Sequence, residues 1–152
     1  MLNRQPKKSR KIFVCLDEQR GQYLVDGLVA MDFPLSSGVK AYPTKTGDYA
    51  VISKKEDHAS NLYGKMYDAE GKCINYNAES TDPIPEGGRF DGSPMPYWQR
   101  LTNAGLGLHV GKVRRHPVSH GCVRLPRNVA EILYRQTSIG TPVTCLLYTS
   151  DA

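Results

Sequence analysis

One thiol and three imidazoles lie close together in the sequence. The segment HPVSHGC, residues 116–122, places Cys122 two residues after His120, and His109 and His116 lie upstream. A cysteine becomes a nucleophile when its thiolate is populated, and a neighbouring imidazole or backbone N–H groups can stabilise that thiolate. Gly121 lets the backbone bend tightly beside the sulfur. The segment is therefore consistent with a nucleophile and its base, with a metal site or with an ordinary loop.

Two histidines are candidates for the base. In extended structure the side chain of His120 projects to the same face as that of Cys122. His109 ends a predicted strand, and a base on a neighbouring strand is held more rigidly than one on the same loop. We therefore expect His109 to be the base and His120 to shape the oxyanion site. The backbone amides of Gly121 and Cys122 could donate to the oxyanion of an acyl-transfer reaction.

The same side chains could instead hold a metal ion or be incidental. His109, His116, His120 and Cys122 could act as ligands, but zinc sites more often show paired cysteines or a His–Glu signature. From spacing alone, an incidental histidine near a loop cysteine is the more frequent case. We expect no metal and no organic cofactor, because thiolate, imidazole and oxyanion donors suffice for acyl transfer.

Composition places the chain among soluble globular proteins. Its 152 residues suit one domain, and its formal charge of +5 comes largely from the first eleven residues. No nucleic-acid recognition module accompanies that charge, so we expect no nucleic-acid partner. No apolar run is long enough to insert into a membrane, and the start is not a complete signal peptide. The other cysteines, Cys15, Cys73 and Cys145, are too sparse for a disulfide scaffold.

Short β-type runs separated by turn residues predict a mainly β domain. Asp26–Gly27 suits a tight hairpin turn, and residues 68–71 suit a second one. The stretch from Asn77 to Pro96 predicts a long loop, which is our candidate for a mobile flap. One helix, PRNVAEILYRQT, begins near Pro126. The expected strands cover residues 11–16, 22–25, 28–36, 49–53, the two arms of a hairpin over 62–76, 105–110 and 141–147.

These features divide the chain into three parts. Residues 1–10 are expected to be a basic, disordered tail, and residues 11–147 a single domain. The final letters CLLYTSDA look like a translated sequencing adaptor, so residues 148–152 are a candidate non-native tail.

The segment LHVGKVRRHPVSHGCVRLP resembles the signature of the L,D-transpeptidase catalytic domain, a family of bacterial cell-wall enzymes. That signature is an upstream histidine, then Ser/Thr-His-Gly-Cys, an aliphatic residue and Arg or Asn. The matching positions are His109, Ser119, His120, Gly121, Cys122, Val123 and Arg124. YPTKTGDYAVISK and GGRFDGSPMPYWQRLTNAGLGLH resemble other family segments, so the resemblance covers residues 11 to about 145. Lys45 departs from the family's usual proline.

The resemblance implies a mixed β-sandwich with one helix after the catalytic cysteine loop. It implies that Cys122 forms the acyl-enzyme, that His109 takes its proton and is oriented by a backbone carbonyl, and that His120 and Gly121 surround the oxyanion. Substrate-binding roles follow by resemblance for four residues: Ser119, Arg124, Tyr97 and Trp98. For Trp98 a core role is equally compatible.

The expected function is that of a peptidoglycan L,D-transpeptidase. The thiolate would attack the L,D peptide bond of a tetrapeptide stem, release D-alanine and pass the acyl group to an amine. Hydrolysis of the same bond by a carboxypeptidase or amidase, or a noncatalytic wall-binding module, are the alternatives. The resemblance also implies acylation by carbapenems and a place in the periplasm or cell envelope of a bacterium, with the export signal absent from this chain. We expect a monomer.

Overall fold

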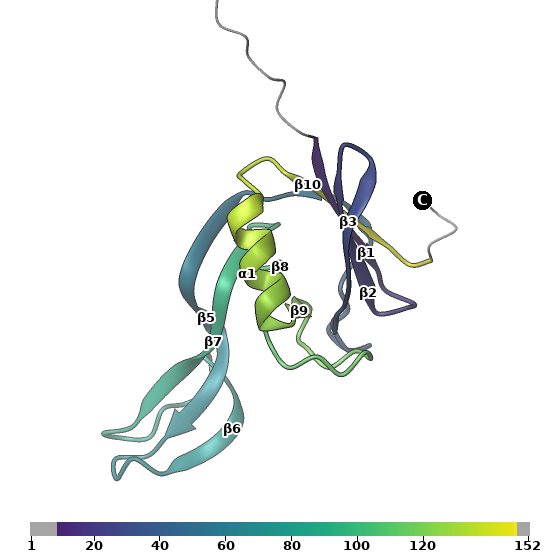
Figure 1. Ribbon diagram of the computed structural model, residues 1–152. Coiled ribbons are helices and arrows are strands. Elements are labelled where there is room, and N and C mark those ends of the chain that lie inside the picture. Colours follow the sequence, from purple (N-terminus) through teal and green to yellow (C-terminus); the bar gives the residue numbers. More distant parts are fainter. Residues whose placement is uncertain (1–8, 149–152) are drawn as a thin grey trace, which may run out of the picture. The chain divides into compact units, whose positions relative to one another are not determined.

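The computed structural model describes residues 9–148, which form two β-sheets and one α-helix (Figure 1). The elements are β1 (Arg10–Cys15), β2 (Arg20–Val25), β3 (Leu28–Pro34), β4 (Gly47–Ala50), β5 (Ser53–Tyr67), β6 (Cys73–Glu79), β7 (Arg89–Arg100), β8 (Gly107–Val110), β9 (Val123–Leu125), α1 (Arg127–Gln136) and β10 (Pro142–Leu146). The first sheet has the order β3-β2-β1-β10-β4, and the second has the order β6-β5-β7-β8-β9. Both sheets are mixed, because β1 pairs with β10, and β8 with β9, in parallel. The predicted mainly β fold with one helix after the Cys122 loop is confirmed.

Turn chemistry fixes the first hairpin. Strands β2 and β3 are joined at Asp26 and Gly27, whose φ angles are 52° and 79°. Positive φ at both central residues defines the two-residue hairpin turn whose twist matches that of the flanking strands. Asp-Gly is among the preferred sequences there, so the predicted turn is confirmed.

The chain divides into two compact units. The first contains the residues up to Lys55 and those from Tyr97 onward, and the second is the continuous segment Glu56–Pro96. The single domain over residues 11–147 stays a prediction. Strands β5 and β7 each contribute residues to both.

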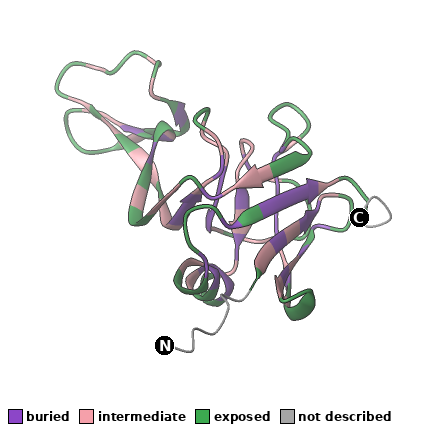
Figure 2. Cartoon of the chain, turned by 90° about the horizontal axis from the view of Figure 1, so that it is seen from above, coloured by how far each residue is buried: buried purple, intermediate pink, exposed green. Residues whose placement is uncertain are grey.

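The hydrophobic core of the first unit joins side chains from both sheets and from the helix. Figure 2 shows the buried segments in purple. The buried cluster contains Ile12, Val14, Tyr23, Phe33, Leu35, Val51, Leu101, Leu108, Val123, Leu125, Val129, Ala130, Leu133, Val143 and Cys145. Because strands of both sheets enter one core, burial of this cluster fixes the strands that carry the candidate site.

Helix α1 begins after Pro126 and buries one side against the core. Val129, Ala130 and Leu133 are its buried residues, and it packs beside β8. The ammonium group of Lys54 donates to the carbonyl oxygens of Tyr134 and Thr137, the latter at 2.8 Å. A cation at this end stabilises the last, otherwise unpaired carbonyls of the helix. Burial lowers the pKa of Lys54.

The second unit corrects the prediction of a long loop from Asn77 to Pro96. Strand β6 continues to Glu79 and β7 begins at Arg89, so only residues 80–88 lie between strands. Inside this unit β5 and β7 approach closely at Gly92, where an added Cβ would lie 3.0 Å from the carbonyl carbon of Ser60. The glycine that suggested a loop therefore permits strand pairing instead. A role of this segment as a flap stays a prediction.

Both predicted tails lie mostly outside the described residues. Residues 1–8 and 149–152 are not described, while Arg10 already belongs to β1 and the Ser9 amide donates to the carboxylate of Asp26 at 2.8 Å. Tyr148, the first residue of the candidate non-native tail, is exposed. Within residues 9–148, no helical segment has the length and apolar character that spanning a bilayer requires.

Candidate active site

The pairing of β8 with β9 brings the predicted nucleophile and base to one face of the second sheet. Leu108 lies opposite Val123 and His109 opposite Arg124. Paired residues on neighbouring strands share a face, and residues two apart along a strand share it too. His109, Arg124 and Cys122, which directly precedes β9, therefore belong to one face, called here the reactive face.

The other face of these strands is apolar. Leu108, Val123 and Leu125 are buried in the core, and helix α1 packs beside β8. The strands that carry His109 and Cys122 are therefore anchored by hydrophobic burial on the side away from the chemistry.

Cys122 is a half-buried thiol at the end of its turn. Its Sγ donates a hydrogen bond to the carbonyl oxygen of Gly105 at 3.2 Å. Burial raises the pKa of the Cys122 thiol, and the Gly107 amide and the guanidinium groups of Arg100 and Arg124 oppose this rise. The raised pKa means that the thiol keeps its proton at neutral pH, so nucleophilic attack needs a base.

His109 has the features of that base. It is buried, and its Nδ1 lies 2.6 Å from the carbonyl oxygen of Val110. A carbonyl can only accept, so Nδ1 carries the hydrogen, and the neutral tautomer compatible with this contact has its lone pair on Nε2. The indole of Trp98 lies 6.0 Å from the imidazole, measured between ring centroids. The carbonyl and the indole together fix the orientation of the ring.

Ser119 shapes the turn that presents the sulfur. Its hydroxyl donates to the carbonyl oxygen of Cys122 at 2.5 Å and accepts the Gly121 N–H at 3.1 Å. Its side chain is buried, with 3% of the residue exposed. The resemblance implied that Ser119 binds substrate, whereas the structure uses its hydroxyl inside the turn.

Only one of the two predicted oxyanion donors is free in this turn. The Gly121 N–H is bonded to Ser119, whereas the Cys122 N–H has no hydrogen-bond partner among residues 9–148. Gly121 has a φ of 122°, which residues with a side chain rarely adopt, so its contribution is the bend itself. The imidazole of His120 contacts the ring of Tyr42, with centroids 5.0 Å apart and an edge-to-face geometry.

A buried polar network braces the turn. Ser37 accepts the Val118 and Ser119 amides on its carbonyl oxygen, at 2.9 and 3.1 Å. Gln19 holds Ser37 in turn, because its Oε1 accepts the Ser37 amide at 2.9 Å and its Nε2 donates to the hydroxyl at 2.8 Å. The sequence analysis missed Gln19 and Ser37, since no local pattern shows that these polar side chains are buried.

A second brace comes from Thr44. Its hydroxyl accepts the Gly38 amide at 2.9 Å and donates to the carbonyl oxygen of Gly121. Gly38 lies so close to the turn that an added Cβ would stand 2.7 Å from the Cα of Gly121 and would overlap the carbonyl oxygen of Tyr42. Backbone atoms meet directly at this point.

We expect Gly38→Ala to destabilise the protein by about 3 kcal/mol, because the new methyl group meets backbone that cannot rotate away. The reaction of Cys122 with iodoacetamide should also slow, since the turn must shift. The matched control is Gly140→Ala, where no heavy atom lies within 4 Å and only a φ of 97° is strained; about 1 kcal/mol is expected. Urea unfolding and peptide mass spectrometry measure both effects. Equal losses in the two variants would contradict the bracing role of this contact.

Ser119→Ala removes the hydroxyl that serves both Cys122 and Gly121. We expect a loss of about 1–2 kcal/mol in stability, because a partly buried carbonyl and a partly buried amide lose their partner. The reaction rate should fall more than the affinity for the acyl donor, because the position of the sulfur is what changes. Ser138→Ala, on an exposed turn, is the control. Steady-state kinetics that show only a raised KM would instead favour substrate binding by Ser119.

The two aromatic residues predicted to line a donor cleft lie in different surroundings. Trp98 is 3% exposed and packs on Gly107, where an added Cβ would overlap the indole and lie 2.6 Å from its Cζ3. It therefore forms a buried wall beside His109. Tyr97 contacts the ring of Tyr134 on α1, with centroids 5.5 Å apart, so its side chain is engaged with the helix.

Arg124 reaches the reactive face from β9. Its backbone pairs with Ser36, and its aliphatic stem packs on Gly111, where an added Cβ would lie 2.7 Å from Cγ. Burial lowers the pKa of Arg124, while the Cys122 sulfur raises it. Within residues 9–148 no carboxylate forms an ion pair with this guanidinium.

His116 is exposed, and its Nδ1 lies 3.3 Å from the carbonyl oxygen of Pro117. No group of three or more His, Cys, Asp or Glu side chains arranged to hold a metal ion occurs in the part of the chain that the structure describes.

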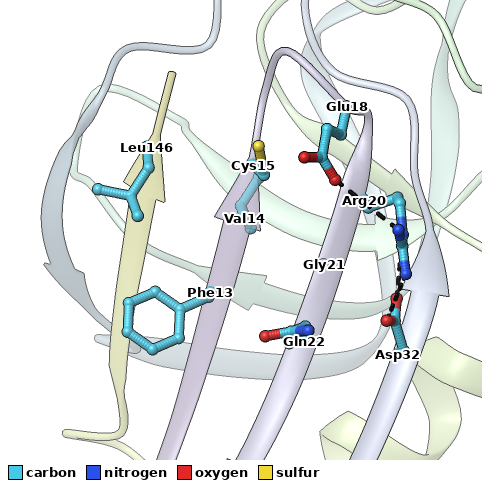
Figure 3. Close-up of a pocket in the computed structure, with 9 residues that line it drawn as sticks. All are labelled: Phe13, Val14, Cys15, Glu18, Arg20, Gly21, Gln22, Asp32 and Leu146. Atoms are coloured by element: carbon cyan, nitrogen blue, oxygen red, sulfur yellow. Dashed lines mark hydrogen bonds and ion pairs between the residues drawn. The ribbon is translucent and has the colours of Figure 1, made fainter. Parts of the chain in front are cut away.

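A surface hollow of about 270 Å³ lies on the first sheet, between β1, β2 and β10 (Figure 3). Arg20 lines it and forms an ion pair with Asp32 and a longer one, at 3.7 Å, with Glu18. None of the predicted catalytic residues lines this hollow. The site around Cys122 is defined by its side chains and not by this cavity.

An imidazole on a strand and a thiol on a Ser-His-Gly-Cys turn share one face of the sheet, as expected for the class of domains with a cysteine nucleophile and a histidine base. The chain belongs to the L,D-transpeptidase catalytic domain family, because the model of that family (YkuD) matches residues 9–145. This match covers both compact units.

Individual relatives agree with this assignment. The chain is 32% identical over 117 residues to "Probable L,D-transpeptidase 3" of Mycobacterium tuberculosis, which covers 72% of this chain and 36% of that protein. An L,D-transpeptidase structure from Mycobacterium smegmatis matches with a TM-score of 0.69 and 22% identity, covering 91% of this chain and 59% of the other. One from Enterococcus faecium matches with a TM-score of 0.65 and 27% identity, covering 91% and 50%. This chain therefore spans only part of the length of its relatives.

Proposed function

We propose that this domain is a peptidoglycan L,D-transpeptidase in which Cys122 is the nucleophile and His109 the base. The observation that carries the proposal is the parallel pairing of β8 with β9, which gives both side chains one face of the sheet. Membership in the L,D-transpeptidase family supports the same reading.

The first half of the reaction forms an acyl-enzyme. Nε2 of His109 takes the proton of the Cys122 thiol, and the sulfur attacks the carbonyl carbon of the third residue in a tetrapeptide stem. The Cys122 N–H, with His120 beside it, stabilises the negative oxygen of the tetrahedral intermediate. The C–N bond then breaks, the imidazolium returns its proton to the departing amine, and D-alanine leaves.

The second half transfers the acyl group. An amine of another stem gives a proton to His109 and attacks the thioester carbonyl, and the C–S bond breaks as the new amide bond forms. The proton held by His109 returns to the sulfur. A wall-anchored protein could supply the amine in the same way, and water in place of the amine would give hydrolysis.

Arg124 fits a role in binding the donor peptide. Its half-buried guanidinium lies on the reactive face, and stem peptides carry free carboxylates that such a group binds strongly. We propose no direct substrate contact for Ser119 and Tyr97. Trp98 acts on the reaction through His109.

The thiol that reacts with the substrate in this proposal can also react with inhibitors. One related structure is an L,D-transpeptidase in complex with imipenem, and another is a carbamoyl enzyme formed with avibactam. We propose that carbapenems likewise acylate Cys122, because their strained carbonyl is an acyl donor for a thiolate. We further propose that the domain works as a monomer on peptidoglycan in the bacterial cell envelope.

Incubation with purified tetrapeptide stems, followed by mass spectrometry of the products, tests the proposal. A cross-linked dimer together with released D-alanine supports the transpeptidase. Tripeptide without any dimer would replace it with the hydrolase, and unchanged substrate would replace it with a noncatalytic module. Adding a competing amine to the hydrolytic case shows whether the acyl-enzyme can be intercepted.

A further inference from the structure

Arg100 adds a second guanidinium group to the reactive face. It lies at the end of β7, where it pairs with Gly107 of β8 in antiparallel register, and Gln99 pairs with Leu108. Leu108 belongs to the apolar face, so Gln99 does too, and Arg100 shares the face of Gly107 and His109. Sequence reasoning missed this arginine because the register between β7 and β8 is not local information.

Continuation of the register by one residue sets Arg100 in line with the nucleophile. Leu108 pairs with Val123, so Gly107 lies opposite Cys122, and Arg100 lies opposite Gly107 from the other side. Two strand spacings, about 10 Å between backbones, separate Arg100 from Cys122. An arginine side chain covers most of that distance, and its charge lowers the pKa of the Cys122 thiol.

The Arg100 guanidinium is held without a counter-ion. It stacks over the indole of Trp98, 5.3 Å from the ring centroid, and donates a long hydrogen bond of 3.4 Å to the carbonyl oxygen of Thr102. No carboxylate forms an ion pair with it among the described residues, whereas Arg20, Arg89 and Arg135 each have at least one such partner. Stacking leaves the edge of the guanidinium able to donate to a further acceptor.

Two guanidinium groups without a carboxylate partner within residues 9–148 therefore share this face with the protonated Cys122 thiol and the His109 imidazole. Half-buried charges are weakly screened by solvent, so this face attracts anions more strongly than a single exposed arginine would. A carboxylate suits two such guanidinium groups, because it accepts from both in charge-assisted hydrogen bonds.

We propose that Arg100 binds a carboxylate group of the molecule that acylates or alkylates Cys122, and that it thereby sets the preference of the site for anionic ligands. This inference deepens the proposed function by naming the group that the site recognises. It does not depend on transfer to a second stem, because it concerns the first encounter with the sulfur.

The rates at which iodoacetate and iodoacetamide alkylate Cys122 can be compared to measure the effect of the Arg100 charge. In both reactions a C–S bond forms, the C–I bond breaks, iodide leaves and the thiol proton passes to solvent. The two reagents differ in one carboxylate, and any change in thiol pKa cancels in the ratio of their rates. Peptide mass spectrometry reports Cys122 separately from Cys15, Cys73 and Cys145.

We expect Arg100→Met to lower the iodoacetate-to-iodoacetamide rate ratio by roughly fivefold, because methionine keeps the apolar contact with Trp98 but loses the charge. Arg100→Lys should restore part of the ratio, since it keeps a cation. Arg127→Met, on an exposed position of α1, is the matched control and should leave the ratio unchanged. An unchanged ratio in Arg100→Met, or an equal fall in Arg127→Met, overturns the proposal.

Stem peptides then separate this proposal from the proposed function. The donors differ only in whether their carboxylates are free or converted to amides, and Arg100→Met should slow acylation by the free acids only. If no donor acylates the wild-type protein but the alkylation ratio still depends on Arg100, the proposed transpeptidase function is contradicted. The proposed carboxylate-binding role of Arg100 is then supported. If donors acylate the wild type and Arg100→Met is equally active on acid and amide donors, the transpeptidase function is supported. The proposed carboxylate-binding role of Arg100 is then contradicted.

Discussion

Cys122→Ala is expected to form no acyl-enzyme and to reduce turnover by about 10⁴-fold or more, because the nucleophile is lost and only binding and polarisation remain. The fold should persist, since Cys122 directly precedes β9 and is not part of the buried cluster. Intact-protein mass after incubation with a carbapenem and with a tetrapeptide donor measures the effect.

Cys73→Ala is the control for that experiment, because Cys73 is a partly exposed thiol in the second unit. It should leave acylation and turnover at wild-type levels. A mass adduct that persists in Cys122→Ala and disappears in Cys73→Ala would identify Cys73 as the nucleophile. This result would contradict the mechanism proposed above.

His109→Gln is expected to lower the rate of acylation about 10²- to 10⁴-fold near neutral pH. The sign of the pH dependence follows from the thiol. Burial raises the pKa of Cys122, so the proton stays on sulfur at pH 7, and in the proposed mechanism the imidazole removes it. Without that base the rate should increase about tenfold for each pH unit, until the thiol itself ionises. The deficit of the variant therefore shrinks as the pH rises.

His116→Gln serves as the comparison, because His116 is exposed in the loop and has no role in the proposed mechanism. Its acylation rate should follow the wild-type pH profile. Stopped-flow acylation between pH 6 and pH 10 distinguishes the variants. A His109→Gln profile parallel to that of wild type would mean that another group removes the thiol proton.

Local features of the fold could be predicted from the sequence because short-range chemistry determines them. The turn at Asp26 and Gly27 needs positive φ at two consecutive residues, and few residue types accept this. Helix α1 could also be predicted from local sequence, since Pro126 marks its start and Val129 and Leu133 recur at helical spacing on its buried side.

Pairing between distant segments could not be predicted in this way. The segment from Asn77 to Pro96 has the composition of a loop, yet most of it pairs as strand, because glycine allows the close backbone approach seen at Gly92. Strand β9 has only three residues and no periodicity to reveal it, although its pairing with β8 aligns the site.

The candidate site shows the same division. Cys122 and His109 are recognisable by type and by motif, so their assignment rests on the sequence. The tasks of Ser119, Gln19 and Arg100 depend on burial and on register, which only the folded chain defines. A serine beside a catalytic cysteine suggests substrate binding until its hydroxyl is found within the turn.

The parallel pairing of β1 with β10 has a consequence for how the protein is made. Ile12 lies beside Val143, so β1 pairs with β10, a strand that is synthesised much later. At a ribosomal rate of 5–20 residues per second, the intervening chain takes roughly ten seconds to emerge. During that interval β1 and β4 lack the strand that later separates them in the sheet. The first sheet is therefore completed only after synthesis of β10, and the edges of β1 and β4 that pair with β10 stay open until then.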